Sequence, residues 1–514
     1  MNKADARPAR TVAVMMAIMV VGKAMGLWRD SLQARVFGGD TPYANALVQA
    51  SALPNSFLDI MFAAALSASF IPVFSTYLET KGKRAAFDLA SLFISITLVL
   101  TAAVAVISII LATPLYDLFF VIGRRAPHPE TRLLAIQLLR YMFPLMILSG
   151  LAFSFTGILQ SLGEFRLPAA MSIVSNGVIL LYYFLFVDRF GVRGLAVAFL
   201  LGWAAQGLIQ VPWLVKHRFR FRFRINLRDS GLRQIGALAL PVMAASWVLP
   251  VNYLVNLSAA STLYGGDFGG PAMRFSHTFF LIVSGVFVLS VGNVIFPKLS
   301  RQAANNDIEG FKSSLRETVR VVFFFLLPLT FGMMALAQPL IQLIYGGRRF
   351  CDTVVEITAI ALFFFSIGTV GYGLQVVLSR ACFAQKDGKT PLVAAVLAIG
   401  VNGVLSFALL RLEIVGPALA GAIGISLGSL VMVIALTRKG YLAWPPALLV
   451  DLVKMALLAV LMFFAVKFTL SHLGESAVLL QVLLPTVVGT ALYFGGCALL
   501  RMKELTWVMQ NLRR

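Results

Sequence analysis

The amino-acid sequence predicts an all-α polytopic membrane protein with about 14 transmembrane helices. Its 514 residues are 59% hydrophobic and only 13% charged, whereas soluble domains carry roughly 25% charged residues. Apolar stretches long enough to span a bilayer recur from Thr11 almost to Leu500, and about 20 helical residues cross a hydrocarbon core. Strand-like alternation is absent, so a membrane barrel is not expected.

The predicted spans follow one another through short polar loops. The first span is expected to stay in the protein, because its apolar run reaches Trp28 without a signal-peptide cleavage site. The expected spans are residues 11–36, 44–78, 87–115, 132–160, 167–188, 193–215, 235–260, 271–297, 318–345, 353–382, 390–411, 415–436, 446–470 and 477–500.

The net charge of +21 is concentrated in alternate loops. Lys and Arg clusters mark the N-terminus, the loops after every second span and the C-terminal tail, which all lie on one predicted side. By the positive-inside rule, we expect both termini to lie in the cytoplasm. Arg124 and Arg125, after the third span, are the main exception.

A basic segment separates the sixth and seventh spans. Residues 217–224 alternate basic and aromatic side chains, a pattern that can stack on single-stranded nucleic acid. Its place between two spans instead favours an amphipathic cytoplasmic linker that holds anionic lipid headgroups. No nucleic-acid partner is therefore expected.

The two sides of this linker resemble each other at an offset of about 225 residues. Ser175-Asn-Gly-Val178 resembles Val401-Asn-Gly-Val404, and Pro72 corresponds to Pro297. Because six spans separate equivalent positions, the repeats are parallel and are expected to enclose a central cavity that works by alternating access. The expected domains are a six-helix bundle (1–216), the basic linker (217–234), a second six-helix bundle (235–440), and two extra helices with a basic tail (441–514).

Ionisable residues inside the spans are the candidate site. Lys23, Arg29 and Asp30 lie in the first span and Arg274 in the eighth, where a charge facing lipid costs at least about 2.5 kcal/mol. One interpretation is a structural ion pair, with Asp30 or Asp59 as the acid. The other is a cationic cavity for a diphosphate, to which arginine donates bidentate hydrogen bonds.

Other buried polar residues are less specific. Asn55 follows Pro54 in the second span, and such amides more often join helices than bind ligands. The three cysteines are scattered and His277 has no neighbours at metal-ligand spacing, so neither a metal site nor a cofactor is predicted. Nucleotide-binding and hydrolase motifs are also missing from the sequence, and no catalytic residue is predicted.

Several motifs resemble one family. Gly26-Leu-Trp-Arg-Asp30, Leu53-Pro-Asn55, Phe70-Ile-Pro72 and the loop Ala381 to Pro391 resemble the MurJ/MviN family of the multidrug/oligosaccharidyl-lipid/polysaccharide exporter superfamily. The resemblance covers most of the chain. It implies a flippase for lipid II, the undecaprenyl-diphosphate-linked peptidoglycan precursor, which passes from the cytoplasmic to the periplasmic leaflet.

Residue by residue, the resemblance implies a substrate site with two departures. Arg29 and Asp30 match the family's helix-one arginine and its acidic neighbour, and Lys23 stands in the place of another arginine. The family's paired arginines after Leu-Pro-Asn align with Leu58 and Asp59. Its arginine in the eighth span aligns with Thr278, and Arg274 lies about one helical turn earlier. The candidate substrate-binding residues are Lys23, Arg29, Asp30, Asn55, Asp59 and Arg274.

Other functions remain open on the sequence. The departures at Leu58 and Thr278 leave room for another lipid-linked oligosaccharide, such as an exopolysaccharide unit. A drug or ion antiporter would need acidic residues in the cavity, and a membrane glycosyltransferase would need a large loop with catalytic carboxylates. Both are disfavoured, so we expect a transporter rather than an enzyme, energised by a coupling ion, the membrane potential or neither.

Overall fold

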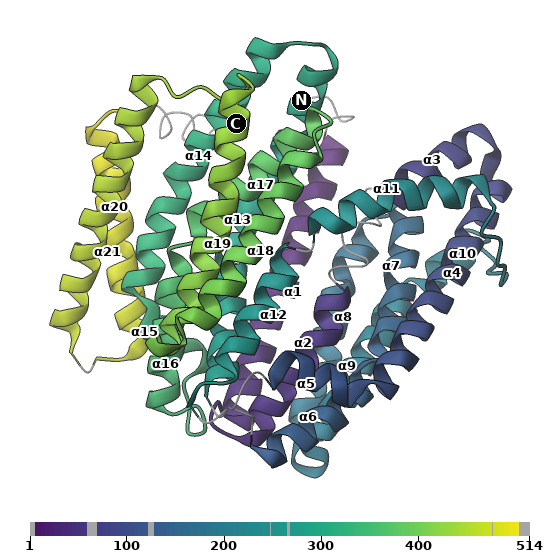
Figure 1. Ribbon diagram of the computed structural model, residues 1–514, viewed down its shortest axis with the longest axis horizontal. Coiled ribbons are helices and arrows are strands. Elements are labelled where there is room, and N and C mark those ends of the chain that lie inside the picture. Colours follow the sequence, from purple (N-terminus) through teal and green to yellow (C-terminus); the bar gives the residue numbers. More distant parts are fainter. Residues whose placement is uncertain are drawn as a thin grey trace. The chain divides into compact units, whose positions relative to one another are not determined.

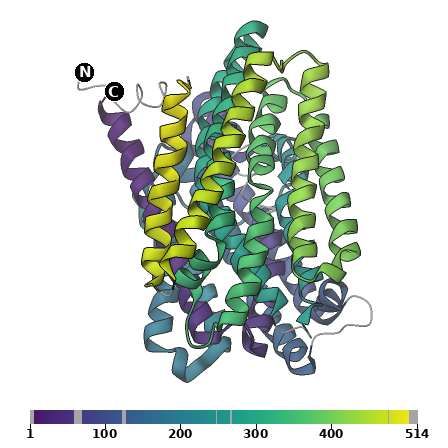
Figure 2. The same ribbon diagram turned by 90° about the vertical axis from the view of Figure 1, so that its left-hand side faces the viewer.

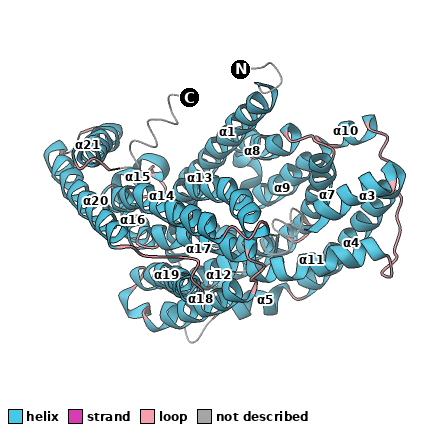
Figure 3. Ribbon diagram, turned by 90° about the horizontal axis from the view of Figure 1, so that it is seen from above, coloured by secondary structure: helices cyan, strands magenta, loops and turns pink. Residues whose placement is uncertain are grey.

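The computed structural model describes residues 6–58, 69–121, 128–246, 248–264, 268–474 and 476–502. These ranges contain helices joined by turns and loops and no β-strand (Figure 1, Figure 3). This confirms the predicted all-α fold class. Asp59, Arg124 and Arg125 lie outside the described residues.

The chain divides into two compact units, with the boundary inside helix α12 between Leu254 and Val255. The first unit packs α1 on α8, α8 on α9, α2 on α6 and α4 on α7. Its helices are α1 (Ala6–Phe37), α2 (Pro42–Leu58), α3 (Ile71–Thr80), α4 (Gly82–Ile110), α5 (Ala112–Phe120), α6 (Pro129–Met142), α7 (Leu145–Ser161), α8 (Arg166–Leu185), α9 (Val187–Leu208), α10 (Val211–Lys216) and α11 (Ser230–Ser246).

The second unit begins in α12 (Val248–Ala260) and packs α18 on α19, α17 on α19 and α13 on α16 and α17. The last two helices, α20 and α21, lie side by side, and α20 packs on α14 (Figure 2). The remaining helices are α13 (Gly269–Ala304), α14 (Ile308–Ala335), α15 (Ala337–Tyr345), α16 (Asp352–Ser366), α17 (Thr369–Ala384), α18 (Lys389–Ala408), the short η4 (Leu410–Leu412), α19 (Val415–Arg438), α20 (Pro446–Leu473) and α21 (Val478–Leu499).

The predicted spans coincide with these helices. Within the described ranges each span falls on one helix or on consecutive helices, as span 132–160 falls on α6 and α7. Ten described helices are long and apolar enough to cross a membrane, or eleven if α16 and α17, bent by 45°, form one span. The protein is thus a multi-pass membrane protein, and the total of 14 stays a prediction.

Helices α8 and α18, which the predicted repeat pairs, begin in the same way. Glu164 Oε1 accepts the backbone N–H groups of Arg166 (2.8 Å) and Leu167 (3.3 Å) before α8. Asp387 Oδ1 accepts those of Lys389 and Thr390, both at 3.1 Å, before α18. Each carboxylate satisfies N–H groups that the first helical turn leaves without an intrahelical partner.

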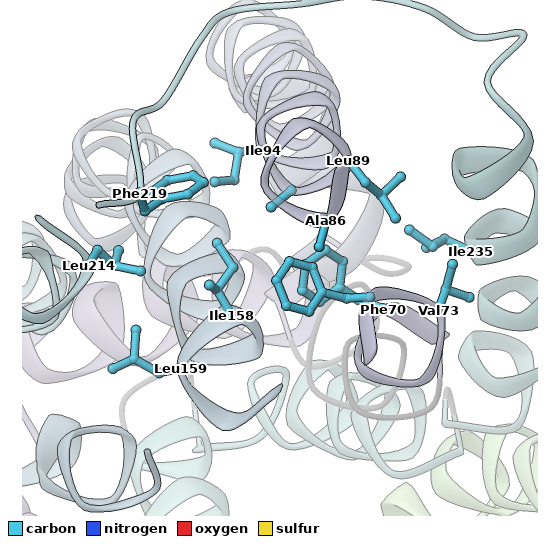
Figure 4. Close-up of a cluster of buried hydrophobic side chains, with 12 residues drawn as sticks. Phe70, Val73, Ala86, Leu89, Ile94, Ile158, Leu159, Leu214, Phe219 and Ile235 are labelled. Atoms are coloured by element: carbon cyan, nitrogen blue, oxygen red, sulfur yellow. The ribbon is translucent and has the colours of Figure 1, made fainter. Parts of the chain in front are cut away.

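Each unit has a core of large apolar side chains. In the first unit, Phe70, Phe74 and Leu89 from α3 and α4 pack with Ile158 of α7 and Phe219 of the loop after α10 (Figure 4). In the second, residues of α20 and α21 such as Met455 and Tyr493 pack against Phe324, and the Tyr493 hydroxyl donates to the Phe324 carbonyl (2.9 Å).

Gly371 permits the close approach of α17 to α19. A Cβ at this position would lie 2.6 Å from Ser426 Oγ and 2.9 Å from its Cα. We expect Gly371→Ala to lower the free energy of unfolding by about 1–3 kcal/mol, because this contact overpacks the interface. Thermal melting of the purified protein measures the change. Gly400→Ala is the control, since its Cβ would meet nothing within 4 Å; equal melting temperatures for both variants would contradict this account.

Candidate functional site

The charged residues of the first span form an ion pair in α1. Arg29 donates from Nε (3.1 Å) and Nη2 (2.9 Å) to Asp30 Oδ1. The Asp30 residue is only 2% exposed, whereas the Arg29 side chain is 22% exposed. A buried carboxylate therefore holds a guanidinium that is still partly accessible.

A second helix fixes the other side of Arg29. Arg29 Nη1 donates to Asn176 Oδ1 of α8 (2.9 Å), and Asn176 Nδ2 donates to the Gly22 carbonyl of α1 (3.1 Å). The guanidinium carbon also lies 5.7 Å from the ring centroid of Phe199 in α9. These contacts set the orientation of the planar group and leave some of its N–H donors for a ligand.

Asn176 was not among the residues predicted from the sequence. The motif Ser175-Asn-Gly-Val178 marked the repeat, but a contact between positions 147 residues apart needs the packing of α8 on α1. Gly22 makes that packing possible, since an added Cβ would lie 3.1 Å from Ser172 Oγ. The recurrence of this asparagine in both repeats was the signal that could have identified it.

The other predicted residues are placed separately. Lys23 and Asn55 are exposed in the first unit. Arg274 is half-buried in the second unit, on α13, with its guanidinium carbon 6.0 Å from the ring centroid of Phe275. The structure thus brings Arg29 and Asp30 together.

The second unit carries an uncharged counterpart of the network. The offset that relates Asn176 to Asn402 also relates Asp30 to Asn256. Ser406 Oγ lies 2.9 Å from Asn256 Oδ1 and 3.1 Å from Asn402 Oδ1. Amides and a hydroxyl therefore join helices α12 and α18 at the place where α1 and α8 are joined through an ion pair.

The loop between α17 and α18 contains a second charged cluster. Asp387 Oδ2 accepts the Thr390 hydroxyl (2.5 Å) and the Lys439 ammonium that follows α19. Burial would raise the pKa of Asp387, but these bonds and the backbone bond from Thr390 lower that pKa to about 2. The carboxylate also raises the pKa of Lys439. The cluster ties the start of α18 to the end of α19.

We expect Asp387→Asn to lower the melting temperature at pH 7. A carboxyl whose folded pKa lies below its unfolded value of about 3.9 contributes its full stability above that value and loses it as the pH falls through about 2. The difference in melting temperature between wild type and Asp387→Asn should therefore shrink as the pH falls from about 4 to about 2. Melting curves across this range measure it, with Lys386→Gln as control; a pH-independent gap would contradict the assignment.

Across the described residues, no group of three or more His, Cys, Asp or Glu side chains is arranged to hold a metal ion.

Solved structures share this fold. A structure of the lipid II flippase MurJ in an inward closed conformation matches with a TM-score of 0.79 and 22% identity over 98% of this chain and all of that chain. An inward-facing MATE family multidrug transporter of the MOP superfamily matches with a TM-score of 0.69 and 16% identity over 83% of this chain and 97% of that one. The chain thus has the multi-pass helical fold that these two structures share.

Sequence comparison then specifies the family. The family model described as lipid II flippase MurJ matches residues 34–489, and the chain belongs to that family. A probable lipid II flippase MurJ of Treponema pallidum (strain Nichols) is 28% identical over 76% of this chain and 74% of its own. A probable lipid II flippase MurJ of Rhizobium tropici is 26% identical over 95% of this chain and 93% of its own. The lipid II flippase MurJ of Burkholderia cenocepacia is 26% identical over 84% of each chain.

Proposed function

We propose that this protein is a flippase that moves lipid II from the cytoplasmic to the periplasmic leaflet by alternating access. The observation that carries the proposal is the family match over residues 34–489. The relatives in T. pallidum and B. cenocepacia carry the name of a lipid II flippase. The multi-pass helical fold supplies the membrane scaffold that such transport requires.

In the proposed site, Arg29 binds the diphosphate of the lipid. A guanidinium forms charge-assisted, bidentate hydrogen bonds to phosphate oxygens. Asp30 and Asn176 are the positioning residues, because they occupy one side of the guanidinium and fix its plane. The partial exposure of Arg29 supports this role, since a fully enclosed ion pair could not reach a substrate.

The other residues predicted from the sequence stay proposed substrate-binding residues. Lys23 and Arg274 are proposed for their positive charge, which suits a diphosphate, and Asn55 and Asp59 for their polar groups, which suit the headgroup. The exposure of Lys23 and Asn55 and the partial exposure of Arg274 are consistent with ligand contact.

The setting of the proposed transport is the bacterial inner membrane, with both termini in the cytoplasm. The distribution of Lys and Arg over alternate loops supports this orientation. Anionic lipid headgroups are proposed partners of the basic linker, and a coupling ion or the membrane potential is the proposed source of energy.

A second candidate substrate is another polyprenyl-diphosphate-linked oligosaccharide. The observation that favours it is the pair of neutral residues, Leu58 and Thr278, at positions where the resemblance to the family implies arginines. Because Arg29 recognises a diphosphate common to both lipids, the glycan would decide between them.

A binding competition tests the choice of glycan. Native mass spectrometry of the purified protein would be recorded with lipid II and with an undecaprenyl-diphosphate-linked tetrasaccharide at equal concentrations. We expect lipid II to occupy the protein preferentially and Arg29→Ala to lose both lipids. Preferential binding of the tetrasaccharide-linked lipid would overturn the assignment of lipid II as substrate. It would not contradict the role of Arg29 in binding the diphosphate.

A further inference from the structure

The basic segment after α10 is a fixed part of the first unit rather than a loose connection. Its residues 218–228, here the arginine strap, form neither helix nor strand. Phe219 is buried among residues of α3, α4 and α7, with its ring centroid 5.3 Å from that of Phe87 (Figure 4). The Arg224 backbone N–H donates to Ser95 Oγ (3.0 Å). The strap is thus anchored at two points along α4.

The free face of the strap alternates charge and apolar surface. Arg218, Arg220 and Arg222 are exposed. Between and beyond them, Phe221, Phe223, Ile225 and Leu227 are 45%, 60%, 58% and 67% exposed. Such a surface has cations for phosphates and large apolar groups for the acyl boundary.

The acidic groups near the strap are already engaged. Asp88 Oδ1 lies 3.2 Å from Arg224 Nη1. Asp229 Oδ1 accepts the backbone N–H groups of Gly231 and Leu232 at the start of α11. Arg218, Arg220 and Arg222 therefore add positive charge to this surface that these two carboxylates do not offset, as does the exposed Arg228 near the end of the strap.

The anchor points place the strap at the depth of a membrane interface. Asp88 is the last charged residue of α4, and the sequence then runs without charge to Tyr116. Ser95 lies seven residues after Asp88, about 10 Å further along the helix. The strap therefore crosses α4 where the uncharged run begins. A backbone without helix or strand pairing cannot sit in the hydrocarbon core, where unpaired N–H and C=O groups are costly.

We infer that the arginine strap is a binding surface for anionic phospholipids. Arg218, Arg220 and Arg222 bind headgroup phosphates while Phe221, Phe223, Ile225 and Leu227 enter the interface beside α4. Each basic residue near an anionic bilayer surface contributes about a fivefold gain in binding. The strap thereby makes the first unit sensitive to the lipid composition of the membrane.

Native mass spectrometry of the full-length protein in an uncharged detergent tests this inference, with phosphatidylglycerol and phosphatidylcholine as probes. Wild type is expected to prefer phosphatidylglycerol, and R218Q/R220Q/R222Q to bind it about 100-fold more weakly. The matched control K298Q/R301Q/K389Q removes three exposed basic residues from the second unit and should keep the preference. Equal loss in both triple variants, or no loss in the strap variant, would overturn the inference.

A separate experiment measures how deeply the strap lies in the membrane. A fluorophore on Cys introduced by Phe223→Cys, in a Cys351→Ser background, is expected to be quenched by lipids brominated near the headgroup. Quenching only by a water-soluble agent would overturn the interfacial placement. The alternating Arg and Phe pattern could instead serve a single-stranded nucleic acid; displacement of phosphatidylglycerol by oligouridylate would overturn the lipid assignment in its favour.

Discussion

Replacing Arg29 by alanine is expected to abolish lipid II transport while the protein stays folded in the membrane. The first unit holds this guanidinium in a defined orientation, through Asp30 of the same helix and Asn176 of α8. Loss of two charge-assisted hydrogen bonds to a phosphate, each contributing about 1.5–3 kcal/mol, reduces binding at least about 100-fold. Arg29→Lys should transport at a rate between those of wild type and Arg29→Ala, because lysine keeps the charge without the planar donors.

The measurement is the rate at which lipid II appears on the outer face of cells that depend on this protein. Arg35→Ala is the matched control, since it removes an exposed arginine from the same helix. An Arg29→Ala variant that transports at the wild-type rate would show that the ion pair is structural only.

Replacing Asp30 by alanine is expected to destabilise the first unit. Asp30 is 2% exposed, and removing one partner of a buried ion pair leaves a charge without compensation, at a cost of about 3 kcal/mol. Asp30→Asn should cost less, because an amide oxygen can still accept from Arg29; the equivalent position of the second repeat carries Asn256. Thermal melting of the purified variants measures both effects.

Transport separates the two roles of Asp30. If it positions Arg29, Asp30→Asn should fold and yet transport more slowly, because a neutral acceptor holds the guanidinium less firmly. A normal melting temperature for Asp30→Ala would contradict the stability argument. Wild-type transport by Asp30→Asn would contradict the positioning role.

The sequence predicted those features that depend on local composition. Long apolar runs marked the helices, because lipid contact requires apolar side chains along a whole span. The opposite charges of the first span indicated an ion pair as one interpretation, with the choice of partners left open, and the structure pairs Arg29 with Asp30. The duplicated motifs predicted a repeat that pairs α8 with α18. Both helices start with a carboxylate that accepts backbone N–H groups, from Glu164 and from Asp387.

What could not be predicted depends on contacts between distant residues. Asn176 reaches Arg29 only because α8 packs on α1. The 45° bend between α16 and α17 lies inside one predicted span. Gly368, at the bend, packs so closely on α19 that an added Cβ would lie 2.9 Å from Ala422 Cα. The anchoring of the arginine strap to α4 requires the buried side chain of Phe219, which the alternating pattern alone does not distinguish from Phe221 and Phe223.

The most direct test of the proposed function is complementation of a bacterium depleted of its own lipid II flippase. Membrane expression would be confirmed, and a periplasmic probe would follow lipid II on the outer face. We predict that the wild-type protein restores both growth and externalised lipid II and that Arg29→Ala restores neither. A well-expressed wild-type protein that leaves lipid II in the inner leaflet would contradict the account.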